Sequence, residues 1–293
     1  MSFLTVIVVL LSAGMHASWN LIAHIQRLNR GLFVRVCLMV GCAGLAPVLL
    51  AEVLGRPFPA AVWGLLAMAG LSLGLYFFGL MMGYRSGEFS LVYPLARSLC
   101  VLFMAGFDVL RGHIPSAAGW LGLSLVAAGC MLTAIRSLRG FHIRQFLHAS
   151  IWWALLIAVA SVGYSTVDKI AAEWLPQSGW SAARYGLWEY LCAAPFVLIL
   201  TSAFTAREAE PIRGTTRWFW PGVVAVLDFG SYWLILCAYQ LSPLASYVLG
   251  LRQFSIVLGV FFGAVVLRES NLSLRFAGAA AVCAGMLCIS LWG

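Results

Sequence analysis

Long runs of apolar residues, separated by short polar connections, extend along the whole chain. A helix that crosses the hydrocarbon core of a bilayer needs about 20 mostly apolar residues. Ten runs reach that length, and the first lacks the basic start of a cleaved signal peptide. The pattern therefore predicts an all-α integral membrane protein with ten transmembrane helices, at residues 3–24, 32–53, 60–84, 89–110, 116–136, 149–171, 181–205, 217–240, 243–267 and 272–292.

The second half of the chain repeats features of the first. An interval between a tyrosine and a later arginine recurs, as does an interval between two glycines. The matching residues are Tyr84 and Arg97 with Tyr239 and Arg252, and Gly122 and Gly129 with Gly278 and Gly285. We therefore expect two five-helix repeats, residues 1–138 and 149–293, joined by a basic linker at 139–148. An odd number of helices makes the repeats inverted, a symmetry that transporters use to build a central site at the midplane.

The distribution of arginines predicts the orientation in the membrane. Cytoplasmic loops are enriched in Lys and Arg, and the connections after odd-numbered helices carry about eleven arginines, whereas the tails carry none. We expect a multi-pass protein of the cell (inner) membrane with both termini on the non-cytoplasmic side.

Composition agrees with a membrane protein and excludes several other classes. The chain is 62% hydrophobic and 10% charged, whereas soluble domains are near a quarter charged. Its net charge of +8 comes from scattered arginines without a basic stripe, so we expect the lipid bilayer and a small molecule as partners, and no nucleic acid. The eight cysteines form no C-x-x-C motif, and no zinc, serine-hydrolase or ATP motif is present. We expect no catalytic residues, no metal and no cofactor.

Two arginines lie inside predicted helices. Arg97 follows Pro94 in the run 89–110, and Arg252 follows Gly250 in the run 243–267. An unpaired guanidinium in hydrocarbon costs roughly 3–15 kcal/mol, so an intramembrane Arg is a candidate functional residue. Two guanidiniums that converge from inverted repeats would favour an anion or the carboxylate of a zwitterion.

A structural ion pair is the alternative for these arginines. Candidate partners are Asp108, Glu189 and Asp228. Asp108 lies close in sequence to Arg111, which is the expected partner of that carboxylate.

The first predicted helix carries polar residues where lipid contact would favour leucine. His16 and Asn20 are four residues apart and share one face, with Trp19 beside them. They either line a substrate cavity or form polar contacts between helices. We take His16, Trp19 and Asn20 as candidate substrate-binding residues.

Further candidates lie mostly in the second half. Tyr164 and Lys169 belong to the run 149–171, and Lys169 either contributes to a cavity or extends toward the interface. Intramembrane carboxylates are candidates for proton coupling. These are Asp168, Glu189 and Asp228. Other tyrosines either line the cavity or form an interfacial belt. The candidates among them are Tyr84, Tyr93, Tyr232 and Tyr239.

Three motifs and the repeat resemble a known family. The His16–Asn20 start, the Gly87–Arg97 run, the Leu267–Glu269 helix end and the five-plus-five repeat are similar to the EamA group of the drug/metabolite transporter superfamily. The resemblance spans the whole chain. It implies a basket-like bundle whose cavity is lined mainly by helices 1, 3, 4, 6, 8 and 9. Substrates of that family include amino acids, other small metabolites and phosphorylated sugars.

We therefore expect a secondary transporter, an exporter or exchanger and not an enzyme, that moves a small anionic or zwitterionic metabolite by alternating access. An amino acid or an organophosphate would fit. The alternatives are an integral-membrane enzyme acting on a lipid-linked substrate and proton-coupled efflux of a cationic compound. Helix 1 lacks the carboxylate that the small multidrug-resistance branch uses, which argues against cation exchange by that route. We expect a monomer, with a homodimer as the alternative.

Overall fold

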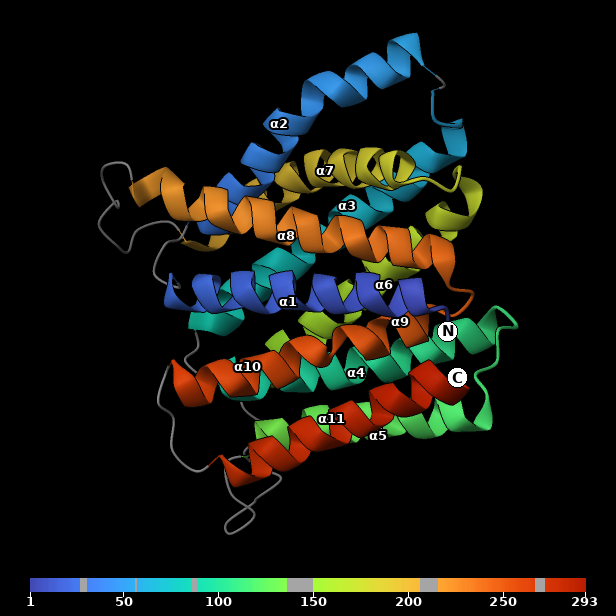
Figure 1. The fold of residues 1–293 in the computed structure, drawn as a ribbon. Coiled ribbons are helices and arrows are strands. Elements are labelled where there is room, and N and C mark those ends of the chain that lie inside the picture. The colour runs from blue at the N-terminus through green and yellow to red at the C-terminus, as the bar shows by residue number, and fades with distance from the viewer. Residues whose placement is uncertain (27–30, 56, 86–88, 136–149, 206–215, 267–271) are drawn as a thin grey trace.

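The computed structural model of the protein describes residues 1–26, 31–55, 57–85, 89–135, 150–205, 216–266 and 272–293, without the side chains at 84–85, 89–93, 150, 204–205 and 216–217. In these ranges the chain forms helices and no β-strand. The helices are α1 (Phe3–Ile25), α2 (Leu32–Leu54), α3 (Ala60–Arg85), α4 (Phe89–Leu110), α5 (Ala117–Ala134), α6 (Ser150–Trp174), α7 (Gly179–Thr205), α8 (Thr216–Leu241), α9 (Ala245–Arg252), α10 (Phe254–Val265) and α11 (Ser273–Trp292). Both chain termini lie at the same end of the bundle (Figure 1).

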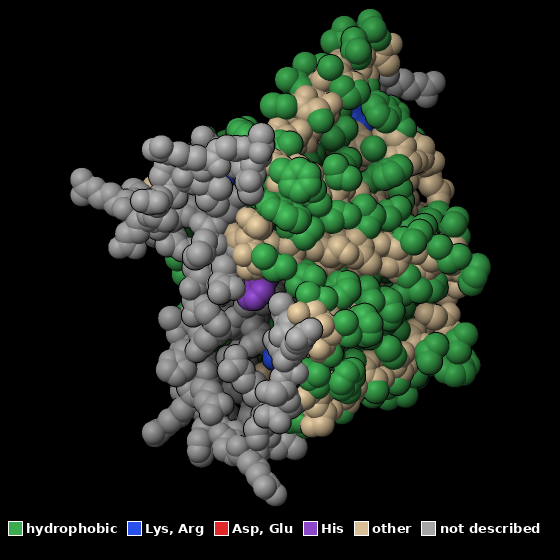
Figure 2. Space-filling view, turned by 60° about the vertical axis from the view of Figure 1, so that its left-hand side comes forward, with side chains coloured by type: hydrophobic (Ala, Val, Ile, Leu, Met, Phe, Trp, Pro, Cys, Tyr) green, Lys and Arg blue, Asp and Glu red, His purple; other side chains and the backbone are tan. Residues whose placement is uncertain are grey.

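Most of these helices are long and apolar enough to cross a membrane. Within the described ranges nine spans qualify, with Ala245–Val265 counted as one. The segment expected at 89–110 is present as α4 but is not among the nine. Hydrophobic side chains cover most of the described surface on the face drawn in Figure 2, which a bilayer accommodates and water does not. The chain is therefore an all-α, multi-pass membrane protein.

The helix expected at 243–267 is interrupted at Gln253, between α9 and α10. The side-chain Nε2 of Gln253 donates to the carbonyl of Leu249 at 2.8 Å, where a regular helix would place the backbone N–H of Gln253. That N–H bonds instead to the carbonyl of Gly250, at 3.2 Å. A side chain that takes over a carbonyl of the helix ladder in this way tightens and bends the helix.

Helices α5 and α11 contact each other through their backbones. A Cβ atom added at Gly122 would lie 2.7 Å from the carbonyl oxygen of Gly285, and one at Gly285 would lie 2.5 Å from that of Gly122. Gly129 and Gly278 are related in the same reciprocal way, at 2.6 and 2.7 Å. Side chains do not fit at these positions, so small residues let the two helices approach closely.

The remaining helices interleave the two halves of the chain. Helix α3 lies against α6 and α7, and helix α8 lies against α1 and α2. Helix α4 packs on α5, α6 and α9, while α1 also contacts α9 and α10 (Figure 1). Side chains from α1, α4 and α9 therefore meet inside the bundle.

Candidate functional site

Three of the candidate residues meet in the interior, in what we call the arginine cluster: His16, Arg97 and Arg252. Arg97 Nη2 in α4 lies 2.7 Å from His16 Nε2 in α1. Arg252 Nη2, at the end of α9, lies 3.1 Å from Nδ1 of the same ring. All three residues are buried, with at most 2% of their surface exposed. The convergence of the two guanidiniums expected from the sequence is present, and an imidazole joins them.

The arginine cluster contains more hydrogen-bond donors than His16 can accept. The indole Nε1–H of Trp19 also points to His16 Nδ1, at 3.2 Å, and the two rings meet edge to face. A neutral imidazole has one acceptor nitrogen, and its other nitrogen carries a proton. Indole and guanidinium groups only donate. The donors around this ring therefore exceed its single lone pair.

Arg252 has further donors available. Among the described residues, its Nε and Nη1 atoms have no hydrogen-bond partner. The ion pairs in the described part of the chain do not include Arg252 either. A structural ion pair of Arg252 with Glu189 or Asp228 is therefore not formed.

A second group, which we call the carboxylate cluster, consists of Asp168, Glu189 and Tyr232. Tyr232 Oη in α8 lies 2.5 Å from Asp168 Oδ2 in α6 and is also hydrogen-bonded to Glu189 Oε2 in α7. Both carboxyl groups are fully buried. One phenol hydroxyl thus joins two carboxyl groups from different helices.

Asp228 and Tyr164 lie around this cluster. Asp228 accepts a hydrogen bond from Tyr190 Oη at 2.8 Å, and the ring of Tyr190 lies 5.9 Å from that of Tyr232. Tyr164 meets Tyr232 edge to face at 5.9 Å. The positive charge of Arg252 interacts electrostatically with the carboxyl groups of Asp168 and Asp228.

A continuous series of ring contacts joins the two clusters. Successive ring centroids lie between 5.0 and 6.4 Å apart. The series runs through His16, Trp19, Phe33, Phe77, Tyr190 and Tyr232. The cationic and anionic groups are thus connected by a buried aromatic surface.

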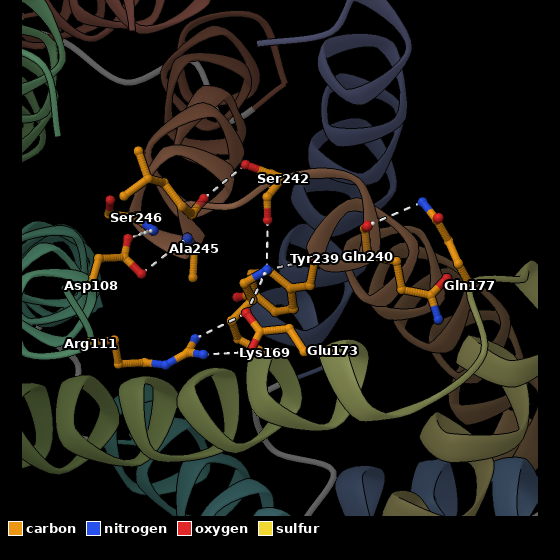
Figure 3. A network of polar contacts seen from close by, with 11 residues as sticks. Asp108, Arg111, Lys169, Glu173, Gln177, Tyr239, Gln240, Ser242, Ala245 and Ser246 are labelled. Atoms are coloured by element: carbon orange, nitrogen blue, oxygen red, sulfur yellow. Dashed lines mark hydrogen bonds and ion pairs between the residues drawn. The ribbon is translucent and has the colours of Figure 1, made fainter. Parts of the chain in front are cut away.

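Lys169 belongs to a different part of the molecule, shown in Figure 3, where it meets the backbone of Tyr239. Lys169 Nζ donates to the carbonyls of Tyr239 and Ser242, at 3.0 and 2.6 Å, and lies 3.2 Å from Glu173 Oε1. An ammonium has three N–H groups, so these contacts use all of them. Lys169 therefore binds one carbonyl in the last turn of α8 and one just after that helix, where a cation is favourable, and does not join the arginine cluster.

Two further contacts complete this network at the end of the bundle. Arg111 Nη1 donates to Glu173 Oε1 at 3.2 Å, and Nη2 pairs with Glu173 Oε2. Asp108 accepts the backbone N–H groups of Ala245 and Ser246, at 3.2 and 2.7 Å, and so caps the start of α9 (Figure 3). The pairing of Asp108 with Arg111 expected from the sequence is wrong, because Arg111 binds Glu173 and Asp108 binds a helix terminus.

The other candidates have separate placements. Asn20 is buried, and its amide nitrogen donates to the carbonyl of His16 at 2.8 Å. The side chains of Tyr84 and Tyr93 lie outside the described residues. Tyr190 was not among the candidates. It directly follows Glu189, and a polar aromatic residue beside an intramembrane acid could have marked it as a candidate. Glu173 was missed because it lies near the end of its helix.

Comparisons with known proteins bear on the fold alone. No protein-family model matches the chain, and no curated protein matches it in sequence. Among solved structures, 22 chains are similar. One of them, described only as a crystal structure of a protein, aligns with a TM-score of 0.65 and 17% sequence identity, over 99% of this chain and 98% of its own. The whole chain therefore shares its fold with a protein of known structure.

Proposed function

We propose that this chain is a secondary transporter of a small anionic or zwitterionic metabolite, with the arginine cluster as the site for the anionic group. The observation that carries the proposal is the convergence of two buried guanidiniums on the ring of His16, with two donors of Arg252 that have no partner among the described residues. Trp19 and Arg252 both direct donors at Nδ1, and Arg97 directs another at Nε2. A carboxylate or phosphate brings a negative charge and several acceptor oxygens, two of which can bind the planar fork of a guanidinium at once.

We further propose ten helices in two inverted five-helix repeats, residues 1–138 and 149–293, around a central cavity. Three relationships support this arrangement. Helix α3 contacts α6 and α7 as α8 contacts α1 and α2. The glycine contacts between α5 and α11 are reciprocal, as a two-fold axis requires. The arginines at matching places, Arg97 and Arg252, contact opposite nitrogens of one imidazole.

The carboxylate cluster and the aromatic series suit a zwitterion such as an amino acid. Its anionic group would bind the arginines and its apolar part would contact the rings. Asp168 and Glu189 would lie toward its positive end. An organophosphate would use the arginine cluster alone.

Alternating access requires that one end of the site be closed when the other is open. The network around Glu173 joins α4, α6, α8 and α9 (Figure 3), at the end of the bundle where the termini lie (Figure 1). We assign it the role of the gate at that end, which we expect on the non-cytoplasmic side from the distribution of arginines in the sequence.

Counterflow in liposomes containing the purified protein tests the proposal. Vesicles are loaded in turn with amino acids, phosphorylated sugars and organic cations, and uptake of the labelled compound is followed. We expect counterflow of an anion or zwitterion that falls at least tenfold in Arg97→Gln and in Arg252→Gln. The matched control is Arg184→Gln, since Arg184 is also buried but is paired with Glu52.

Two outcomes would overturn the assignment. Counterflow of cations that survives both substitutions would make the arginines structural and move the site to the carboxylates. A product chemically different from the loaded compound would favour an enzyme acting on a lipid-linked substrate.

A further inference from the structure

The carboxylate cluster requires one more hydrogen than its tyrosine supplies. Asp168 Oδ2 and Glu189 Oε2 are both hydrogen-bonded to the single hydroxyl of Tyr232. That hydroxyl has one proton and can donate it to one carboxylate. The second contact is a hydrogen bond only if the other carboxyl group is protonated and donates to the phenol oxygen. We propose that Asp168, Glu189 and Tyr232 hold one exchangeable proton, and that this proton is co-transported with the anionic substrate.

Burial makes a doubly ionised cluster unfavourable. The outer oxygens, Asp168 Oδ1 and Glu189 Oε1, have no hydrogen-bond partner among the described residues. The two carboxyl groups also approach the same hydroxyl, so two negative charges would repel each other across it. One shared proton removes that repulsion and completes both hydrogen bonds.

The surrounding ionisable groups leave the cluster short of positive charge. Those that interact with its carboxyl groups come from α7, α8 and α9: Tyr185, Tyr190, Cys192, Tyr239 and Arg252. Arg252 alone among them carries a positive charge, and it also interacts with Asp228. The one guanidinium thus acts on both Asp168 and Asp228, and Asp228 is hydrogen-bonded to a tyrosine of its own, Tyr190.

Arg252 links this proton to the substrate. It is a donor of the arginine cluster, and its positive charge also acts on the carboxylate of Asp168. An anion bound to Arg252 cancels that attraction, so the carboxylate cluster then retains its proton more firmly. By reciprocity the proton raises the affinity for the anion by the same factor. Proton and anion therefore move in the same direction, which under an inward proton gradient drives uptake, in contrast to the exporter expected from the sequence.

Infrared difference spectroscopy of the purified protein tests the proton site without any substrate. Spectra at acid and alkaline pH should show the C=O band of a buried carboxylic acid. We expect Asp168→Asn and Glu189→Gln each to remove this band and Tyr232→Phe to shift it. The matched control is Asp228→Asn, because Asp228 is also buried and bound by one tyrosine but shares it with no second carboxyl group. A band that only Asp228→Asn removes overturns the inference, and so does the absence of any such band in the wild type.

Transport then tests the coupling, which rests on the proposed function. The probe is the compound of the loaded panel that shows counterflow. In the wild type, an inside-alkaline pH gradient should drive its accumulation at least fivefold. Asp168→Asn and Glu189→Gln each imitate the protonated state, so in both variants the pH gradient should no longer raise accumulation above the level reached without a gradient, whatever counterflow they retain. Counterflow that no gradient drives in the wild type refutes the coupling alone, whereas absence of counterflow refutes the proposed function.

Discussion

Arg111 and Glu173 form a two-point ion pair between the end of α4 and the end of α6, 62 residues apart in sequence. Lys169 reaches the same carboxylate and at the same time one carbonyl in the last turn of α8 and one just after that helix. Glu173 is thus the point at which these contacts meet. If this network is a gate, its removal should change which side of the membrane reaches the interior.

Glu173→Gln should open this end of the bundle. A neutral amide cannot pair with two cations, so Arg111 and Lys169 lose their common partner. The reporter is a cysteine at Ser246, which is buried within the network. We expect labelling of Ser246→Cys in intact cells by a membrane-impermeant maleimide to rise several-fold in the Glu173→Gln background, with the same protein lacking Ser246→Cys as the blank. Glu52→Gln breaks an ion pair between α2 and α7 and should leave the labelling unchanged; equal increases in both would show general loosening.

Both termini should be accessible from outside the cell. They lie at the same end of the bundle (Figure 1), and the arginine-rich connections are expected at the other end. Epitope tags at residue 1 and residue 293 should bind antibody on intact cells, whereas a tag inserted within the predicted linker 139–148 should bind only after permeabilisation. The reverse pattern would mean that the network around Glu173 lies on the cytoplasmic side.

Gly129→Ala should destabilise the protein. The added methyl group would lie 2.6 Å from the carbonyl oxygen of Gly278, which is backbone and cannot turn away. Overpacking of this kind costs about 1–3 kcal/mol, and we expect a lower midpoint of thermal unfolding in detergent. Gly106→Ala is the matched control, because a Cβ atom there meets nothing within 4 Å and a helical Gly→Ala change stabilises by about 0.5–1 kcal/mol. Equal effects of the two substitutions would contradict backbone contact between α5 and α11.

His16→Phe should lower stability as well as transport. The ring shape is largely kept, but the ring nitrogens that Arg97, Arg252 and Trp19 contact are lost. Hydrogen bonds to charged groups contribute about 1.5–3 kcal/mol, so the unfolding midpoint should fall measurably. His113→Phe, at an exposed position, serves as the control. An unchanged midpoint in His16→Phe would mean that the imidazole does not hold the arginines.

The pattern of apolar runs predicted most of the helices to within a few residues, because span length follows from bilayer thickness. The interruption at Gln253 was not predictable in the same way, since it depends on a side chain bonding to one particular carbonyl. Repetition in the sequence was enough to expect Arg97 and Arg252 together. That His16 joins them could not be read from the sequence, because a contact across 236 residues leaves no local pattern. For the same reason the partners of Lys169 and Asp108 became visible only in the fold.

The reciprocal glycine contacts also have a consequence for biosynthesis. The glycine face of α5 leaves the ribosome well over a hundred residues before α11, the last helix of the sequence. Until α11 is inserted, the backbone of α5 at Gly122 and Gly129 faces lipid without its partner. The contact is therefore completed only after α11 has been translated, and a chain truncated before Ser273 would expose this surface to the quality-control machinery of the membrane.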